Sequence, residues 1–355
     1  MPMQPAAAAA PGSAQPVALL MSALAAQRLG PVLQQACGPA GCRLLLAEEQ
    51  PAGSACGAQL AFVSRDITGR STKHRLEPAT AHFHALLRQA PGLRWVHAHS
   101  AGADRPVYQA LLARGVRITT SSGANAQVVA QTALAGVLAL ARGLPALAAA
   151  QRERRWSPPP LQALPADLSG QQAVVLGWGP IGQALARYLT MLELRVTVVR
   201  RHAGEPAAGL PTAGLDDLPA LLPRTDWLLL ACPLTEHTRG LVSAPMLRRL
   251  RPGARLVNVA RGEVLDEPAL VAALREGRLA GAYLDVFAQE PLPVDSPLWH
   301  LPQVLLTPHC AGFSSGNEAR VDGLFLHNLK AWHQGAPLRN EVTGPPIPTP
   351  AGDIP

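Results

Sequence analysis

The stretch that decides the fold is Ala173-Val-Val-Leu-Gly177-Trp-Gly179-Pro-Ile-Gly182, an apolar run leading directly into a G-x-G-x-x-G turn. An Ala- and Leu-rich helical stretch, 181–192, follows at once. Gly177 permits the tight turn, Gly179 lets the backbone approach a pyrophosphate, and Gly182 lets the helix pack close to the strand. The helix N-terminus adds free N–H groups and a positive dipole end. We therefore predict a nicotinamide dinucleotide on Gly177, Trp178, Gly179, Pro180, Ile181 and Gly182.

The end of the next apolar run carries the signal for the type of dinucleotide. An NAD enzyme usually places a carboxylate there, about 20 residues beyond the turn, to accept from the ribose 2′-hydroxyl. Here the run 195–199 ends in Arg200 and Arg201. A guanidinium pairs with a 2′-phosphate, which a carboxylate would repel. We predict NADP(H), with NAD(H) as the alternative.

Apolar runs alternate with helical or turn-like stretches on both sides of this turn, which predicts two α/β domains built on parallel sheets. The expected strands are 17–20, 43–47, 60–63, 93–97, 116–119, 173–176, 195–199, 227–231, 255–259, 282–286 and 304–307. The expected helices include 125–142, 181–192, 267–276 and 318–334, and a Pro-rich connection lies at 157–160.

Composition narrows the class of protein. Of the 355 residues, 48% are hydrophobic and 15% charged, as in a globular chain. No apolar run reaches the length of a membrane span without Gly, Pro or charge. Residues 1–15 have no basic region ahead of an apolar stretch, so we expect a flexible tail and not a secretory signal, and 345–355 form a second Pro-rich tail.

Charge and cysteine usage suggest partners and compartment. The net charge of +7 comes mostly from dispersed arginines, which favours small anionic ligands over nucleic acid. The five cysteines are odd in number and follow no metal-ligand spacing. We expect no metal site and a reduced cytoplasm as the compartment.

Three later segments carry candidate catalytic groups, each at the end of an expected strand. Arg261 lies in Asn258-Val-Ala-Arg-Gly262, Glu290 in 284–293, and His309 in Leu306-Thr-Pro-His309. Ligands of open α/β sheets bind outside the carboxyl ends of the strands, so these three side chains are expected to converge on one crevice.

The chain resembles the D-isomer-specific 2-hydroxyacid dehydrogenase family. The matching stretches are 175–182, Cys232-Pro-Leu-Thr235, 258–262, 284–292 and 307–309, with weaker matches at 93–96, 100–104 and 123–125. The resemblance implies two doubly wound parallel-sheet domains, with a Rossmann coenzyme domain inserted into a flavodoxin-like substrate domain. It places the substrate domain at 16–123, the dinucleotide-binding domain at 124–314, and a helix returning to the substrate domain at 315–344.

The resemblance also implies roles for individual residues. His309 exchanges a proton with the substrate oxygen, Glu290 holds the ring and favours its charged form, and Arg261 binds the carboxylate and polarises the carbonyl. The remaining implied contacts are Ser100, Ala101 and Gly102 to the substrate, and Cys232, Pro233, Thr238, Ala260 and Asp285 to the cofactor. Asp285 corresponds to the acceptor for the nicotinamide carboxamide.

Three functions remain open at this point. The arginine that follows the run 195–199, Arg200, is similar to the strand end of glyoxylate/hydroxypyruvate reductases. The leading hypothesis is therefore reduction of a small 2-keto acid by NADPH. The alternatives are a dehydrogenase of a bulkier acid, such as phosphoglycerate, and a dinucleotide-sensing scaffold like the corepressor relatives of the family. The resemblance further implies a homodimer.

Overall fold

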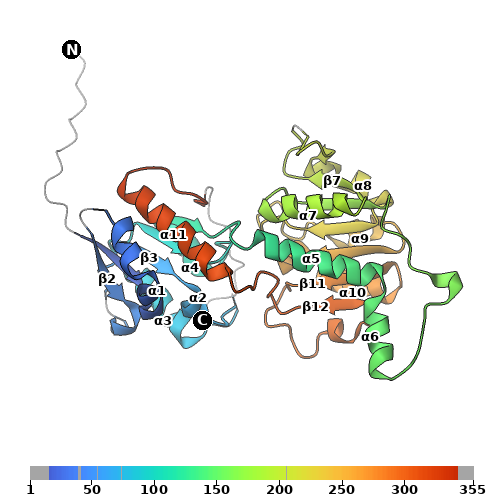
Figure 1. Ribbon diagram of the computed structural model, residues 1–355, viewed down its shortest axis with the longest axis horizontal. Coiled ribbons are helices and arrows are strands. Elements are labelled where there is room, and N and C mark those ends of the chain that lie inside the picture. The colour runs from blue at the N-terminus through green and yellow to red at the C-terminus, as the bar shows by residue number, and fades with distance from the viewer. Residues whose placement is uncertain (1–15, 39–40, 54, 73, 205, 343–355) are drawn as a thin grey trace, which may run out of the picture. The chain divides into compact units, whose positions relative to one another are not determined.

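The computed structural model describes residues 16–38, 41–53, 55–72, 74–204 and 206–342, so the tails predicted at 1–15 and 345–355 lie outside the described residues. The chain divides into two compact units (Figure 1). Unit 1 comprises the described parts of Met1–Ser71, Leu76–Ser121 and Val321–Pro346. Unit 2 comprises the described parts of Thr72–Arg75 and Ser122–Arg320.

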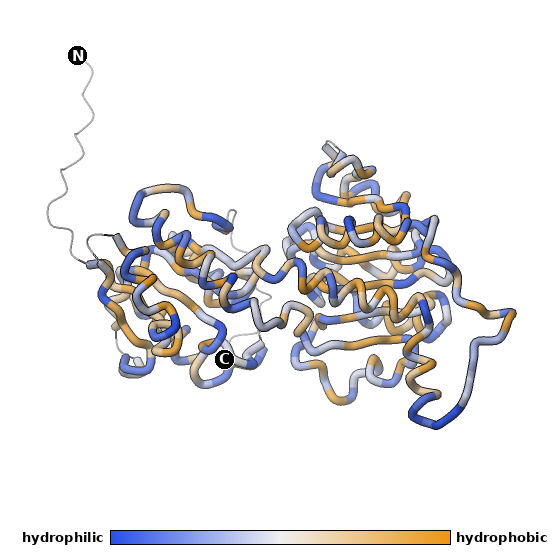
Figure 2. Tube along the Cα trace, viewed as in Figure 1, coloured by the Kyte–Doolittle hydropathy of each residue, from blue (hydrophilic) through white to orange (hydrophobic). Residues whose placement is uncertain are grey.

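Unit 1 is built on a parallel five-stranded sheet in the order β2-β1-β3-β4-β5. Its strands are β1 (Val17–Met21), β2 (Cys42–Leu46), β3 (Leu60–Val63), β4 (Trp95–Ala98) and β5 (Arg117–Thr120). This is the flavodoxin-like strand order, which confirms the predicted class. Strands β1, β3, β4 and β5 consist mostly of buried residues, as expected where helices cover both faces of a parallel sheet, whereas the edge strand β2 is only partly buried. Figure 2 shows the hydrophobic segments along the trace of the chain.

The helices of unit 1 connect the strands and close the sheet. They are α1 (Ala23–Ala36), α2 (Arg65–Thr68), α3 (Pro78–Arg88), α4 (Pro106–Ala113) and, from the far end of the chain, α11 (Asn317–His333). Phe325 of α11 stacks on Phe62 of β3, with 4.2 Å between ring centroids. Beyond α11, Glu341 forms an ion pair with Arg117 of β5. Aromatic packing and this pairing therefore join the C-terminal segment to the first sheet.

Unit 2 is built on a parallel seven-stranded sheet in the order β12-β11-β10-β9-β6-β7-β8. The strands are β6 (Gln172–Leu176), β7 (Arg195–Val199), β8 (Thr212–Ala213), β9 (Trp227–Leu230), β10 (Ala254–Asn258), β11 (Leu279–Leu284) and β12 (Val304–Leu306). The order reverses between β6 and β9, which are neighbours in the sheet. In doubly wound sheets this reversal is where a ligand binds.

The principal helices of unit 2 are α5 (Ala126–Ala141), α6 (Leu144–Arg152), α7 (Pro180–Met191), α8 (Leu218–Leu221), α9 (Ala244–Arg249) and α10 (Glu267–Arg275). Gly136 of α5 lies against Tyr283 of β11, where an added Cβ would come within 2.5 Å of the ring. A glycine is required at that point because helix and sheet approach so closely. Among the described residues, no single helix is long and apolar enough to cross a membrane, whereas the pair α5 and α6, bent by 73°, meets that test together by length and composition only.

The structure departs from the predicted elements in small ways. Neither α6 nor the short edge strand β8 was predicted, whereas the Pro-rich residues 157–160 lie in an irregular connection as expected. The strand predicted at 282–286 is shifted toward the N-terminus, which leaves Asp285 just beyond β11.

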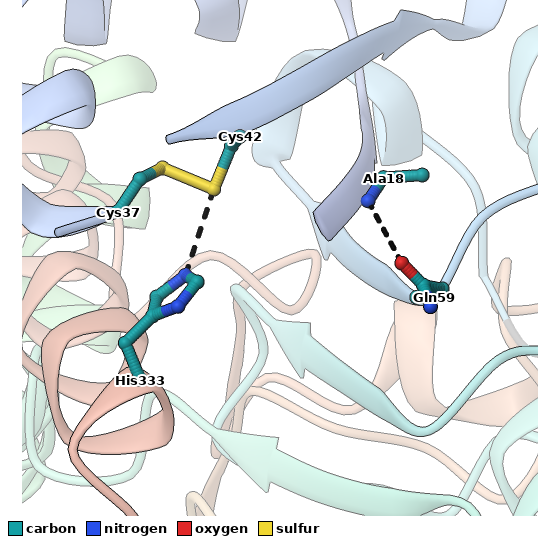
Figure 3. Close-up of a disulfide and its surroundings, with 5 residues drawn as sticks. All are labelled: Ala18, Cys37, Cys42, Gln59 and His333. Carbon is teal, nitrogen blue, oxygen red and sulfur yellow. Dashed lines mark hydrogen bonds between the residues drawn. A yellow bond between two sulfur atoms is a disulfide. The ribbon is translucent and has the colours of Figure 1, made fainter. Parts of the chain in front are cut away.

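Two of the five cysteines are joined in the structure, whereas the sequence predicts reduced thiols. Cys37 and Cys42 form a disulfide, with their Cα atoms 5.6 Å apart (Figure 3). Cys37 caps the end of α1 and Cys42 begins β2, five positions further along the chain. Cys56, Cys232 and Cys310 carry free thiols.

Candidate active site

The glycine turn lies at the reversal of the sheet, between the ends of β6 and β9. Gly177 has φ +113°, and a Cβ there would lie 2.7 Å from the carbonyl oxygen of Ala231, which follows β9. Both the backbone conformation and the contact require glycine. The turn therefore follows the edge of the sheet closely.

The other two glycines fit a bound pyrophosphate. An added Cβ at Gly182 would come within 2.0 Å of the Gly177 carbonyl oxygen, whereas one at Gly179 would meet nothing within 4 Å. Gly182 thus closes the helix onto the turn, and Gly179 leaves open space in front of the N-terminus of α7. Free N–H groups and the helix dipole at that end suit a phosphate.

Arg200 and Arg201 follow β7, next to the glycine turn in the sheet. The Nε of Arg200 donates to the carbonyl of Ala203 at 2.8 Å, which holds the guanidinium in the turn after the strand. Arg201 lies with an Nη 3.0 Å from Nε2 of His237. Two guanidinium groups and an imidazole therefore gather beyond β7, where a ribose 2′-substituent would be expected.

The loop after β9 contains the predicted cofactor residues Cys232, Pro233 and Thr238. Cys232 is buried, and burial raises the pKa of its thiol to about 12, so the thiol stays protonated. The Thr238 hydroxyl donates to the Pro233 carbonyl at 2.7 Å and accepts from the Thr235 N–H at 2.8 Å. These bonds fix the shape of the loop.

Arg261 follows β10, on a loop shaped by its neighbours. Asn258 accepts from the Ala260 N–H at 3.0 Å and donates to the Arg261 carbonyl at 3.1 Å. One Nη of Arg261 donates to the carbonyl of Ala260 at 2.7 Å. An added Cβ at Gly262 would overlap the carbonyl group of Phe287, so the Arg261 loop packs directly on the loop after β11.

Asp285 is buried just beyond β11 and organises the next loop. Its Oδ1 accepts from the Thr307 hydroxyl at 2.6 Å and from the backbone N–H groups of Cys310 and Ala311 at 2.9 and 3.0 Å. Burial raises the pKa of the carboxyl, and these hydrogen bonds partly oppose the shift. Asp285 therefore anchors the segment that carries His309.

The Glu290 and His309 side chains form a direct pair. Nδ1 of His309 lies 2.8 Å from Oε2 of Glu290, and Oε1 of the same carboxylate accepts from the Phe287 N–H at 3.0 Å. Glu290 is 9% exposed at its side chain and His309 47%. The imidazole thus reaches solvent while its partner is buried and oriented.

His309 adopts a backbone conformation that is uncommon for a residue with a side chain, with φ +50°. Its N–H donates to the Asp285 carbonyl at 2.8 Å. Asp285 therefore holds the backbone of His309, and Glu290 holds its ring. Such contacts are expected at functional sites, where the surrounding structure maintains an unfavourable backbone conformation.

The predicted residues fall into two groups in space. The structure brings the candidate residues of unit 2 to the carboxyl edge of one sheet, where β10, β11 and β12 are neighbours. Ser100, Ala101 and Gly102 follow β4 in unit 1, and the Ser100 hydroxyl donates to the Gly102 carbonyl at 2.7 Å. That loop is preformed within its own unit.

Sequence reasoning missed several supporting residues. His237 contacts Arg201, Thr307 contacts Asp285, and Thr72 donates its hydroxyl to the Glu290 carbonyl at 2.7 Å. Thr307 stands two positions before His309 in the motif Leu306-Thr-Pro-His309, so the sequence offered a signal for it. Nothing in the sequence links His237 to Arg201 or Thr72 to Glu290, because these pairs are distant in the chain.

Comparison with known proteins agrees with this arrangement. Residues 134–311 match the model of the D-isomer specific 2-hydroxyacid dehydrogenase NAD binding domain. A glyoxylate reductase of Korarchaeum cryptofilum is 36% identical over 255 residues, which cover 70% of this chain and 76% of that protein. A glyoxylate/hydroxypyruvate reductase B of Yersinia enterocolitica is 34% identical over 267 residues, covering 73% and 80%.

A solved structure extends the similarity to nearly the whole chain. The D-isomer specific 2-hydroxyacid dehydrogenase of Xanthobacter autotrophicus Py2, in complex with NADPH and MES, superposes with a TM-score of 0.73 at 33% identity. The match covers 93% of this chain and 98% of that one.

Proposed function

This chain belongs to the D-isomer specific 2-hydroxyacid dehydrogenase family, and we propose that it reduces glyoxylate or hydroxypyruvate with NADPH. The observation that carries the proposal is the His309–Glu290 pair at 2.8 Å, next to the loop of Arg261 on the same sheet edge. The names of the two reductases that are similar to this chain indicate small 2-keto acids as their substrates. That similarity, together with the two arginines beyond β7, favours a small substrate and a phosphorylated cofactor.

In the proposed reaction a bound nicotinamide would supply the hydride for the keto carbon. His309, charged and held by Glu290 through Nδ1, gives a proton from Nε2 to the keto oxygen, and the neutral ring accepts it in the reverse direction. Arg261 binds the substrate carboxylate and polarises the carbonyl, which fixes the carbon for attack. The backbone N–H groups of the 100–102 loop are also proposed to bind the substrate carboxylate.

The residues present fit the proposed cofactor. The open space at Gly179 and the N-terminus of α7 would receive the pyrophosphate, and Arg200 and Arg201 would bind the 2′-phosphate. Trp178, Pro180 and Ile181 would line the turn, and Cys232, Pro233, Thr238 and Ala260 would line the adjacent loops. Asp285 would accept from the carboxamide through lone pairs that its backbone partners leave free.

A charge reversal at Arg200 tests the cofactor assignment. In Arg200→Asp the ratio of kcat/KM for NADPH to that for NADH should fall about 10- to 100-fold, since a charged hydrogen bond worth roughly 1.5–3 kcal/mol is lost. Steady-state kinetics with both cofactors measure the ratio. The control is Arg195→Asp, an exposed arginine at the opposite end of the same strand. An unchanged ratio in Arg200→Asp would remove Arg200 from the cofactor site.

The substrate proposal is tested by a panel of 2-keto acids. NADPH oxidation is followed with glyoxylate, hydroxypyruvate, 3-phosphohydroxypyruvate and a branched 2-keto acid. We expect the two small acids to give the highest kcat/KM. A preference for either bulkier acid would overturn the proposed substrate, and NADPH binding without turnover of any acid would favour a sensing scaffold.

We further propose that the protein is a homodimer joined through the segment from α6 to residue 164. This segment exposes five large apolar side chains: Leu144 at 49%, Leu147 at 39%, Trp156 at 98%, Leu161 at 81% and Leu164 at 57%. Apolar side chains concentrated in one exposed segment are typical of a protein interface.

Removing the apolar surface of this segment should weaken the dimer. A Trp156→Ser, Leu161→Ser double variant is expected to raise the dimer dissociation constant about 30-fold or more, the loss associated with an interface hot spot. Light scattering coupled to size-exclusion chromatography over a dilution series measures it. Val294→Ser removes an equally exposed side chain elsewhere in unit 2 and should change nothing. A monomeric parent protein, or an unaffected double variant, would contradict the assignment.

A further inference from the structure

Three sulfur and nitrogen ligand atoms gather at the edge of the sheet of unit 1. Cys37 caps the end of α1, Cys42 begins the edge strand β2, and His333 is the last residue of α11 (Figure 3). Nε2 of His333 lies 3.6 Å from Sγ of Cys42, and the three ligand atoms all lie within 4.8 Å of one another. None of these residues takes part in the proposed catalysis.

From this geometry we propose that, once the Cys37–Cys42 disulfide is reduced, the two thiolates and His333 bind a zinc ion. The four residues between the cysteines match a spacing common in zinc sites, C-x₂₋₄-C. The sequence predicts no metal site here, because the third ligand, His333, lies 291 residues beyond Cys42 and only the return of α11 to the first sheet brings it close. Oxidation and metal binding are therefore alternative states of one site.

The ligand types match the preferences of zinc. Thiolate and imidazole are its commonest protein ligands, at about 2.3 Å for sulfur and 2.0 Å for nitrogen. Two thiolates balance the charge of the ion, so the occupied site is neutral. His333 is half-buried and contributes a ring nitrogen to the cluster.

The cluster offers three protein ligands, so water would supply the fourth. Cys37 is 1% exposed and Cys42 9%, so the sulfur atoms lie on the protein side of the site. The partly exposed side at His333 admits water, as in zinc sites with three protein ligands. A bound ion would join α1, β2 and α11 at one point.

The change of state balances as a two-electron reduction. A small external dithiol supplies two electrons and two protons to the S–S bond and leaves as its own disulfide. The bond between Cys37 and Cys42 breaks, and each sulfur gains a proton. Zinc then displaces both thiol protons into solvent as the two Zn–S bonds form. A bonded disulfide cannot supply these thiolates, so the oxidised chain is expected to bind no ion.

Cobalt(II) is a spectroscopic probe for this site. The full chain is reduced, freed of reductant under anaerobic conditions and titrated with Co²⁺. We expect one ion per chain, with a thiolate-to-cobalt charge-transfer band that Zn²⁺ abolishes by displacement. The oxidised chain, with its disulfide verified by thiol counting, should show no band.

Two variants and one control separate this site from other thiols. Cys42→Ser should abolish the band. His333→Ala should weaken Co²⁺ binding by on the order of tenfold or more, because even the loss of a residue that only supports a metal ligand costs about that much affinity. His327→Ala, an exposed histidine on the same helix, should bind like the parent. Circular dichroism before and after reduction shows whether the chain stays folded.

The proposal is overturned if the reduced chain, folded or not, gains no band. It is equally overturned if the oxidised chain or His333→Ala binds Co²⁺ as tightly as the reduced parent. Reduction that unfolds the chain without metal binding would assign the disulfide a purely structural role.

Discussion

Replacing His309 by alanine should lower kcat for 2-keto acid reduction about 10²- to 10⁴-fold while leaving the affinity for NADPH nearly unchanged. The physical reason is that a positioned acid contributes this much to a proton transfer. The ring lies outside the glycine turn and contacts Glu290 through Nδ1, so its loss removes the proton donor and not the cofactor site. Kinetics with saturating NADPH and a separate NADPH titration distinguish the two quantities.

The control for this variant is His300→Ala. His300 is exposed and lies in the short helix Pro297–His300 of unit 2. It should retain parental kcat. Glu290→Gln should keep the hydrogen bond to the ring but lose the charge, and we expect an intermediate loss. Unchanged turnover in His309→Ala would contradict the proposed mechanism, and a parallel collapse of NADPH affinity would show that the variant damages the fold of the site.

Replacing Arg261 by alanine should lower kcat/KM for the keto acid by about 10²- to 10³-fold or more. A single donor that stabilises developing charge on oxygen is worth that factor, and Arg261 is also proposed to bind the carboxylate. Arg261→Lys keeps the charge but loses the planar fork, so it should recover only part of the activity. Steady-state kinetics with glyoxylate and hydroxypyruvate provide the measurement.

Arg275→Ala serves as the matched control, since Arg275 is exposed at the end of α10. Its kinetics should equal those of the parent. If Arg261→Lys matched the parent, a point charge would be enough and bidentate binding would be wrong. If Arg261→Ala matched it, the side chain would have no part in the reaction.

Much of the fold follows from local sequence. Strands buried on both faces require continuous apolar runs, so β1, β3, β6, β7 and β9 were visible as such runs. The glycine turn was also predictable, because Gly177 and Gly182 lie so close to backbone atoms that an added Cβ would overlap them. The ends of elements were harder to predict, as at β11, where Val286 and Phe287 continue the apolar pattern beyond Asp285 although the strand ends at Leu284.

The candidate site was predictable where strand order alone brings residues together. Arg261, Glu290 and His309 each follow a strand, and their strands are neighbours. His237 beside Arg201 depends on the path of a long loop, and His333 beside Cys42 depends on the return of α11. Such contacts arise from tertiary packing, which composition and periodicity do not record.

The most direct test of the central claim is the reduction of hydroxypyruvate by NADPH, with the handedness of the glycerate product determined by chiral chromatography. A member of this family that uses Arg261, Glu290 and His309 as proposed should give turnover with saturating NADPH and form D-glycerate. The same preparation of His309→Ala should form almost none in the same time. L-glycerate as the product, or no NADPH oxidation by the folded parent protein, would contradict the account.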